Sequence, residues 1–165
     1  MDQQDLAATT NNEPSENNEF LAPHIELLCA SYHRLTGRDL VPPAISQQDR
    51  ARAVWQSPRA IASHGIEADP VFNYANRTAL RLWRMDWASF TDLPSRYSAE
   101  PVARQERERL LAAVTTRGYI DDYNGVRIAS DASRFRIEQA TVWNVVDEVG
   151  AYRGQAVVFS RWTPL

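Results

Sequence analysis

The pattern of hydrophobic and polar positions predicts an N-terminal helical region followed by segments typical of short strands. Apolar residues recur at helical spacing over residues 23–35. A second helix is expected over 47–55, because a Ser-Pro pair follows it and ends it. After these helices, apolar and polar residues alternate in short segments. This pattern predicts a β-hairpin formed by residues 60–64 and 71–74, which are joined by an acidic turn with a proline.

Helices and long strands are expected after the hairpin. Asn76 and Asp86 can each cap a short helix, and Pro101 and Gly118 mark the ends of a longer one. Three strand-like stretches follow, at 119–129, 134–146 and 152–162. This order predicts an α+β, PAS-like fold, with a five-stranded antiparallel sheet, short helices on one face and an N-terminal helical cap.

The chain divides into three predicted parts. Residues 1–19 are polar and have little to bury, so we expect a flexible tail. Residues 20–57 hold the N-terminal helices, and residues 58–165 form the PAS-like domain. The full length of 165 residues suits one domain with a real core and is too short for two.

Composition and charge exclude several classes of function. A net charge of -3 gives no electrostatic reason to expect nucleic acid or acidic lipid as a partner. All 18 basic residues are arginine, which excludes lysine Schiff-base chemistry and a lysine-containing phosphate loop. Cys29 is the single cysteine, and no signal-peptide pattern or apolar run of roughly 18 residues is present. We therefore predict a cytoplasmic protein that is not in a membrane.

Short strings at regular intervals narrow the prediction. They are LTGR at 35–38, SHG at 63–65, DPVFNYAN at 69–76, LPSR at 93–96, SAEP at 98–101, GYIDDY at 118–123 and TVWN at 141–144. In this order they resemble the MEKHLA domain, a PAS-like family of bacterial proteins that also forms the C-terminus of certain plant homeodomain-zipper transcription factors. The resemblance covers about 25–162 and implies a stand-alone bacterial form with a proposed sensory role. The string that names the plant version is missing, as is a homeodomain or zipper, so DNA binding is not expected.

Candidate ligand residues follow from the expected faces of the strands. On the strand 134–146 the odd-numbered positions are the more apolar set and are expected to face the helices. Gln139 and Thr141 would then lie in an apolar pocket, where a ligand, a water or the backbone must satisfy them. Trp143 is either core or a stacking surface, and Tyr123 is a further candidate ligand residue. On the last strand, Ala156 and Val158 are expected inward and residues 155, 157 and 159 outward. The outward apolar pair, 157 and 159, should be covered by the N-terminal helices or a second subunit.

Other polar residues have both a ligand role and a local role open to them. Asn73 and Asn76 contact a ligand or bond to nearby backbone, the second as a helix cap. Arg96 clamps a carboxylate or phosphate, or pairs with Asp92 or Glu100. His64, next to Gly65 in the first strand, is a pocket proton carrier or is satisfied by the backbone.

The sequence disfavours several cofactors. Haem is disfavoured because the helix expected after Pro101 contains no His or Cys. A flavin bonded to cysteine is disfavoured because Cys29 lies outside the sheet region. No metal site is predicted, since His24 and His33 are nine residues apart and no close pair of ligands exists.

Three hypotheses of function remain open. The leading one is a sensory or ligand-binding module without catalytic output, which binds an unidentified small molecule and signals as a homodimer or through a separate protein partner. The second is a structural interaction module with a filled core and no ligand. The third is a small lyase or isomerase, in which Asp121 or Asp122, beside Tyr123, acts with His64. It requires these side chains to converge on one pocket.

Overall fold

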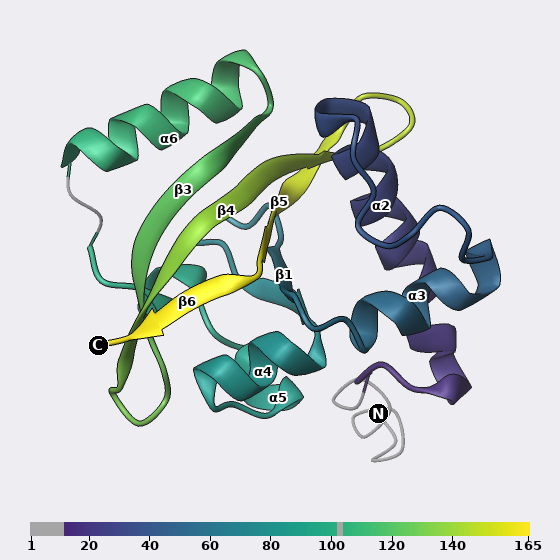
Figure 1. Ribbon diagram of the computed structural model, residues 1–165, viewed down its shortest axis with the longest axis horizontal. Helices are drawn as coiled ribbons and strands as arrows, with labels where there is room; N and C mark the ends of the chain where they lie inside the picture. The colour runs from purple at the N-terminus through teal and green to yellow at the C-terminus, as the bar shows by residue number, and fades with distance from the viewer. Residues whose placement is uncertain (1–11, 102–103) are drawn as a thin grey trace.

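An antiparallel sheet forms the centre of the structure (Figure 1). The computed structural model describes residues 12–101 and 104–165. Its strands are β1 (Ala60–His64), β2 (Phe72–Ala75), β3 (Tyr119–Ile128), β4 (Arg134–Val146), β5 (Tyr152–Phe159) and β6 (Arg161–Pro164). They lie in the order β2-β1-β5-β4-β3, and β6 pairs with β4 beyond the end of β5. The predicted α+β, PAS-like fold is therefore confirmed.

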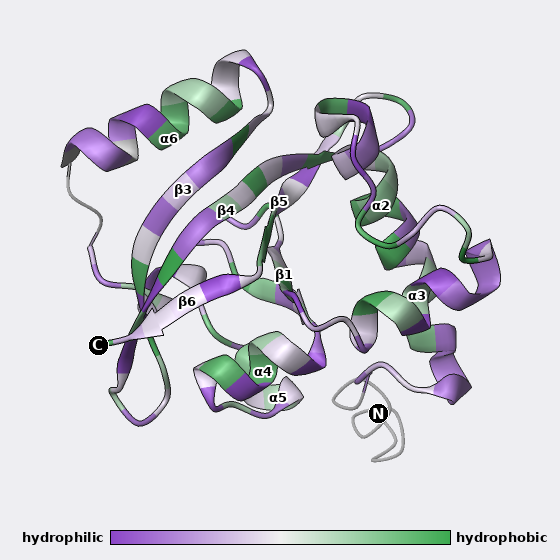
Figure 2. Cartoon of the chain, viewed as in Figure 1, coloured by the Kyte–Doolittle hydropathy of each residue, from purple (hydrophilic) through white to green (hydrophobic). Residues whose placement is uncertain are grey.

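Helices cover both faces of the sheet. They are η1 (Glu16–Leu21), α2 (Ala22–Thr36), α3 (Gln47–Trp55), α4 (Arg77–Trp83), α5 (Trp87–Phe90), η2 (Ser95–Ser98) and α6 (Arg104–Thr116). We call the face under α2 the outer face and the face toward α4, η2 and α6 the inner face (Figure 1). Green hydrophobic segments alternate with purple ones along α2, α3 and α4, as expected for helices that bury one side (Figure 2).

The local signals in the sequence locate most element boundaries. The helices predicted at 23–35 and 47–55 are α2 and α3, and the predicted hairpin is β1 with β2. Asn76 caps α4 by accepting from the Ala79 amide at 3.0 Å, and Asp86 caps α5 by accepting from Ser89 at 2.8 Å. Of the predicted tail, residues 1–11 lie outside the described residues, whereas Glu16–Leu21 form a 3-10 helix that was not predicted.

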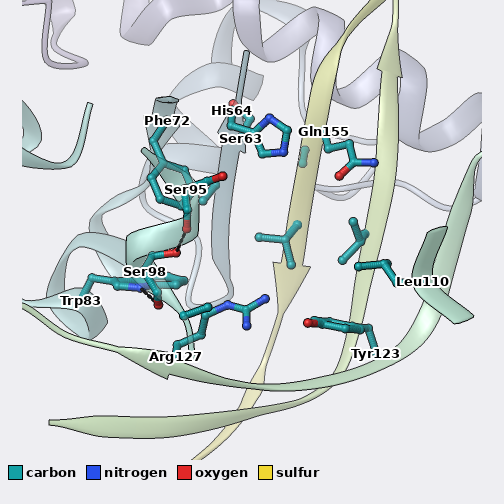
Figure 3. A pocket seen from close by; sticks show the side chains of 15 residues that line it. Ser63, His64, Phe72, Trp83, Ser95, Ser98, Leu110, Tyr123, Arg127 and Gln155 are labelled. Atoms are coloured by element: carbon teal, nitrogen blue, oxygen red, sulfur yellow. Dashed lines mark hydrogen bonds between the residues drawn. The ribbon is translucent and has the colours of Figure 1, made fainter. Parts of the chain in front are cut away.

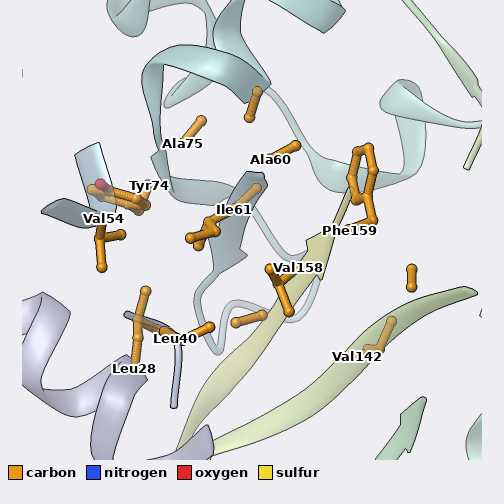
Figure 4. Close-up of a cluster of buried hydrophobic side chains, with 14 of the residues drawn as sticks. Leu28, Leu40, Val54, Ala60, Ile61, Tyr74, Ala75, Val142, Val158 and Phe159 are labelled. Atoms are coloured by element: carbon orange, nitrogen blue, oxygen red, sulfur yellow. The ribbon is translucent and has the colours of Figure 1, made fainter. Parts of the chain in front are cut away.

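The N-terminal helices bury an apolar layer against the outer face. Leu28 of α2 belongs to one buried cluster with Ile61 of β1 and Val158 of β5 (Figure 4). The Tyr32 ring lies 4.8 Å from the ring of Trp143 on β4. The chain's own N-terminal helices thus cover the outer face, but Val157 and Phe159, for which the sequence predicted this cover, lie on the inner face.

A bulge at Gln139 changes which residues of β4 face inward. Gln139 has a φ of +51°, and the pairing of β4 passes from β6 to β5 across it. Before the bulge, Phe135 faces inward and packs against the Trp83 ring at 5.3 Å. After it, Trp143 packs on α2, and Thr141 shares its face because the two are two residues apart. The prediction that every odd position of this strand faces inward is wrong beyond Gln139.

The faces of β5 are also the reverse of those predicted. Ala156 and Val158 pair with outward residues of β1, whereas Gln155 and Val157 turn their side chains inward. Phe159 lies inward too, beside the helix α4. The strand ends there, so the single strand predicted over 152–162 is two strands, β5 and β6.

Candidate ligand-binding cavity

A cavity of about 230 Å³ lies between the inner face of the sheet and the helices α4, η2 and α6 (Figure 3). Its walls are mostly apolar and are supplied by Phe72, Trp83, Leu110, Val142 and Val157. Ligand sites in proteins have this character, with volumes of roughly 300–1,000 Å³ for drug-sized molecules. The cavity suits a smaller molecule.

Two hydrogen-bond acceptors lie at one end of the cavity, on β1 and β5. The Nδ1 of His64 is 2.9 Å from the Gly65 carbonyl and donates to it, so in a neutral ring Nε2 is an acceptor. Gln155 lies opposite His64 in the sheet, and its Nε2 donates to the Asn144 Oδ1 at 3.1 Å. Asn144 is itself oriented, because its Nδ2 donates to the Val114 carbonyl at 2.9 Å. The Gln155 Oε1 therefore faces the cavity (Figure 3).

Donor groups lie at the other end, on β3. Arg127 extends into the cavity toward Tyr123 (Figure 3), and its guanidinium carbon is 5.5 Å from the centre of the Tyr123 ring. The guanidinium donates to the Val126 carbonyl at 3.3 Å and forms no ion pair with a carboxylate of the described residues. The cavity thus carries donors at one end and acceptors at the other.

Two of the predicted ligand residues, His64 and Tyr123, line this cavity. Thr141 and Trp143 face α2 on the outer side of the sheet, because the bulge turns them away. Gln139 is exposed, and its Oε1 accepts from an arginine of β6 at 3.1 Å. Gln139 and Thr141 therefore do not lie in the predicted pocket, and Trp143 packs in the core, because a single extra residue in the strand changes the face of the side chains that follow it.

The two predicted asparagines have local partners. Asn76 is fully buried and bonds only to backbone groups. Asn73 is exposed and its Oδ1 accepts from the Ser63 hydroxyl at 2.5 Å. Neither lines the cavity, so both residues have the second of the two roles open to them, hydrogen bonding to nearby groups of the chain.

Arg96 lies at the surface in an ion pair. Its Nε is 3.0 Å from both carboxylate oxygens of Asp69, rather than beside Asp92 or Glu100 as predicted. This contact raises the pKa of the Arg96 guanidinium, first through the hydrogen bond to Asp69. Arg96 is therefore already engaged, and it does not line the cavity.

The arrangement that the lyase hypothesis requires does not occur. Asp121 pairs with Arg38 at 2.9 Å and Asp122 pairs with Arg109 at 2.8 Å, both at the surface. Neither acid lines the cavity that contains His64. Adjacent residues of a strand face opposite sides, and here both acids are held by arginines instead of converging on one pocket.

Sequence reasoning missed Arg127 and Gln155. A signal for Arg127 existed, because Tyr123, Gly125 and Arg127 are spaced by two residues and so share one face of a strand. Gln155 had no such signal. The sequence placed it outward, since it lies between apolar residues that looked more suited to the inner face.

A polar contact on the outer face ties α2 to the first hairpin. The His24 Nε2 lies 3.0 Å from the Ser63 Oγ, and Ser63 donates its proton to Asn73. The hydroxyl therefore accepts from His24, whose Nε2 must carry the proton. Burial lowers the pKa of His24 to about 4, so the ring is neutral near pH 7.

Acid is expected to weaken the fold through His24. The pKa of about 4 in the folded state lies below the ordinary 6.5, so the unfolded state binds the extra proton between these values. Stability is then complete above pH 6.5 and decreases as the pH falls toward 4, by on the order of 2 kcal/mol. Urea unfolding of the wild type and His24→Gln at about pH 7 and about pH 4.5 measures this difference. Equal losses in both proteins would contradict it.

The chemistry available for cofactors can be judged from the lining residues. Cys29 lies in α2 on the outer side, and burial raises the pKa of its thiol to about 12. No cysteine lines the cavity, so the residues there cannot form a bond between sulfur and a flavin. Among residues 12–101 and 104–165 there is no group of three metal-binding side chains and no helix long and apolar enough to cross a membrane.

An antiparallel sheet with a cavity under short helices is the architecture of a PAS-like domain, and comparison with solved structures agrees. The chain is similar to the PAS domain of a protein from Colwellia psychrerythraea, with a TM-score of 0.56, 15% identity and coverage of 72% of this chain and 95% of that one. It is similar to an RNA-binding light-oxygen-voltage receptor, with a TM-score of 0.58, 20% identity and coverage of 72% and 34%. These likenesses concern the fold alone.

The chain belongs to the MEKHLA domain family, whose model matches residues 22–164. The match includes α2 and α3, which the sequence placed ahead of the domain. The homeobox-leucine zipper protein HOX29 of Oryza sativa subsp. indica is 26% identical over 140 residues, covering 82% of this chain and 16% of that protein. HOX32 of the same subspecies is 25% identical over 138 residues, covering 81% and 16%. The chain thus spans a small part of these plant relatives, and the bacterial form stays a prediction.

Proposed function

We propose that this chain is a sensory module that binds a small organic molecule in the inner cavity and has no catalytic output of its own. The observation that carries the proposal is the set of polar groups at the two ends of an apolar cavity. His64, Gln155, Tyr123 and Arg127 all direct polar atoms into it. Polar groups in apolar surroundings cost free energy unless they are bonded, and a ligand would bond them.

The two faces of β1 supply a route for a signal. His64 faces the cavity, whereas the preceding residue, Ser63, bonds to His24 of α2 on the outer face. A ligand that moves His64 or Gln155 therefore shifts strands on which α2 is packed. The output is a changed surface of the N-terminal helices, read by a second copy of the chain or by a separate protein partner.

Filling the cavity tests whether the molecule binds there. Val157→Phe adds a ring to the cavity wall, so we expect the wild type to carry an extra mass in native mass spectrometry and the variant to lose at least nine tenths of it. Val149→Phe is the matched control, because Val149 is 88% exposed in the β4–β5 loop and its substitution leaves the cavity unchanged. Overpacking costs roughly 1–3 kcal/mol, so circular dichroism is used to confirm that the variant is folded.

The structural interaction module is the alternative outcome of this experiment. Wild-type protein that carries only its own mass, with and without added cell extract, would overturn ligand binding. Retention of the full extra mass in Val157→Phe would instead show that the molecule binds at another place.

A further inference from the structure

The proposed function places a ligand in the inner cavity, and on that basis the polarity of the cavity restricts the chemistry of the ligand. The end at β1 and β5 presents two acceptors, the Gln155 Oε1 and, in a neutral ring, the His64 Nε2, because the Gln155 Nε2 donates to Asn144 and the His64 Nδ1 donates to Gly65. The end at β3 presents a guanidinium, which only donates, together with the Tyr123 hydroxyl. A matching molecule accepts at one end and donates at the other.

The charge of Arg127 favours an anion at the donor end. Several arginines of this chain, such as Arg38, Arg96 and Arg109, have a carboxylate partner within 3.0 Å. Arg127 has none among the described residues, although it lines the same cavity as the apolar side chain of Trp83. An unpaired guanidinium there loses hydration without gaining a counter-ion, and a bound carboxylate would supply two parallel hydrogen bonds.

Gly125 leaves open the place where the two donors meet. A Cβ at Gly125 would lie 2.9 Å from the Arg127 Nη1 and 2.9 Å from the Tyr123 hydroxyl. The three residues share one face of β3, so both donors lie over the Cα of Gly125, where no side chain occupies the space. Any side chain at this position would push them apart, which makes the glycine part of the site.

We propose that the ligand is a small monocarboxylate with an apolar body and a hydroxyl or N–H donor at its far end. The carboxylate accepts from Arg127 and Tyr123 over Gly125. The apolar body contacts Trp83 and Leu110, and the far donor bonds to Gln155 and His64. A second anionic group at the far end would meet only acceptors, so dianions with separated charges are excluded.

The charge requirement is tested with matched probes of one shape. Wild-type protein is titrated with 4-hydroxyphenylacetate, its neutral amide 4-hydroxyphenylacetamide and phenylacetate, and binding is followed by tryptophan fluorescence, because Trp83 lines the cavity. A hydrogen bond to a charged group contributes about 1.5–3 kcal/mol, so the acid is expected to bind about 10- to 100-fold more tightly than the amide. Phenylacetate, which lacks the hydroxyl, is expected to bind several-fold more weakly than 4-hydroxyphenylacetate.

Three variants assign the effect to residues. Arg127→Gln is expected to bind acid and amide equally, and Gly125→Ala to weaken the acid at least fivefold because both donors are displaced. Arg136→Gln is the matched control, since Arg136 is exposed on β4 and pairs in the sheet with Val126 rather than lining the cavity. A preference for the acid that survives in Arg127→Gln, or equal binding of acid and amide by the wild type, would overturn the proposal.

The co-purified mass separates this proposal from the proposed function. If Val157→Phe removes the mass and Arg127→Gln retains it in full, a ligand binds in the cavity but is not held as a carboxylate. If none of the three probes binds to the wild type and no mass co-purifies, the proposed function fails together with the ligand class. Loss of the mass in both variants, with control levels in Arg136→Gln, supports both.

Discussion

Gly154→Ala is expected to destabilise the fold by roughly 3–5 kcal/mol, because it combines backbone strain with a steric clash. Gly154 has a φ of +131°, a conformation that residues with a side chain rarely adopt. A Cβ there would lie 2.0 Å from the His64 carbonyl oxygen, which is a backbone atom of the neighbouring strand and cannot swing away. The strands β1 and β5 would have to separate, beside the acceptor end of the cavity. The free energy of unfolding in urea measures the effect.

Gly150→Ala is the matched control for Gly154→Ala. Gly150 also has a positive φ, +85°, but a Cβ there would have no atom within 4 Å. Only the left-handed conformation is then penalised, at about 1 kcal/mol. If both substitutions cost the same, the close approach of the two strands at Gly154 does not exist in the folded protein.

Asn76→Ala is expected to cost about 3–5 kcal/mol, since one buried side chain satisfies four backbone groups. The Asn76 Oδ1 accepts from the amides of Ile61 at 3.1 Å and Ala79 at 3.0 Å. Its Nδ2 donates to the carbonyls of Val54 at 3.0 Å and Arg59 at 2.8 Å. Asn76 is fully buried, so water cannot replace these bonds, and α3, β1 and α4 lose their common junction.

Asp86→Ala separates loss of a cap from loss of a buried junction. Asp86 caps α5 through a single amide, that of Ser89, and is exposed, so its removal is expected to cost much less than the removal of Asn76. Asn76→Asp keeps both accepting bonds and loses the donating ones. Its loss of stability should lie between those of the two alanine variants if the buried carboxyl is protonated, and should exceed both if it remains charged. Equal effects of Asn76→Ala and Asp86→Ala on thermal unfolding would show that the four bonds are not formed together.

The elements of this fold follow from signals that act over a few residues. Asn76 and Asp86 cap helices because a short polar side chain reaches an amide three positions on, wherever the rest of the chain lies. The helices α2 and α3 follow from apolar spacing and from the glycine and proline residues after them. The order of elements and the family strings were sufficient to predict the PAS-like fold.

The candidate site was predicted only in part, because the face of the sheet on which a side chain lies depends on how the strands pair. His64 and Tyr123 line the cavity, although the pairing register shifts beside each of them, so a simple alternation of faces does not account for their placement. Gln139 breaks that pattern with a φ of +51°, and a single inserted residue reverses every later side chain of β4. No local feature of the sequence marks a glutamine for this conformation.

The amino-acid sequence by itself determined the types, order and approximate ends of the elements, the family, and the absence of lysine chemistry. The tertiary structure alone decided that Gln155 and Arg127 face one cavity, that Arg96 is occupied by Asp69, and that α2 covers the outer face. The physical reason is range. Caps, turns and periodicity depend on interactions between residues that are close in the sequence. A cavity and its polarity arise where strands far apart in the sequence come into register.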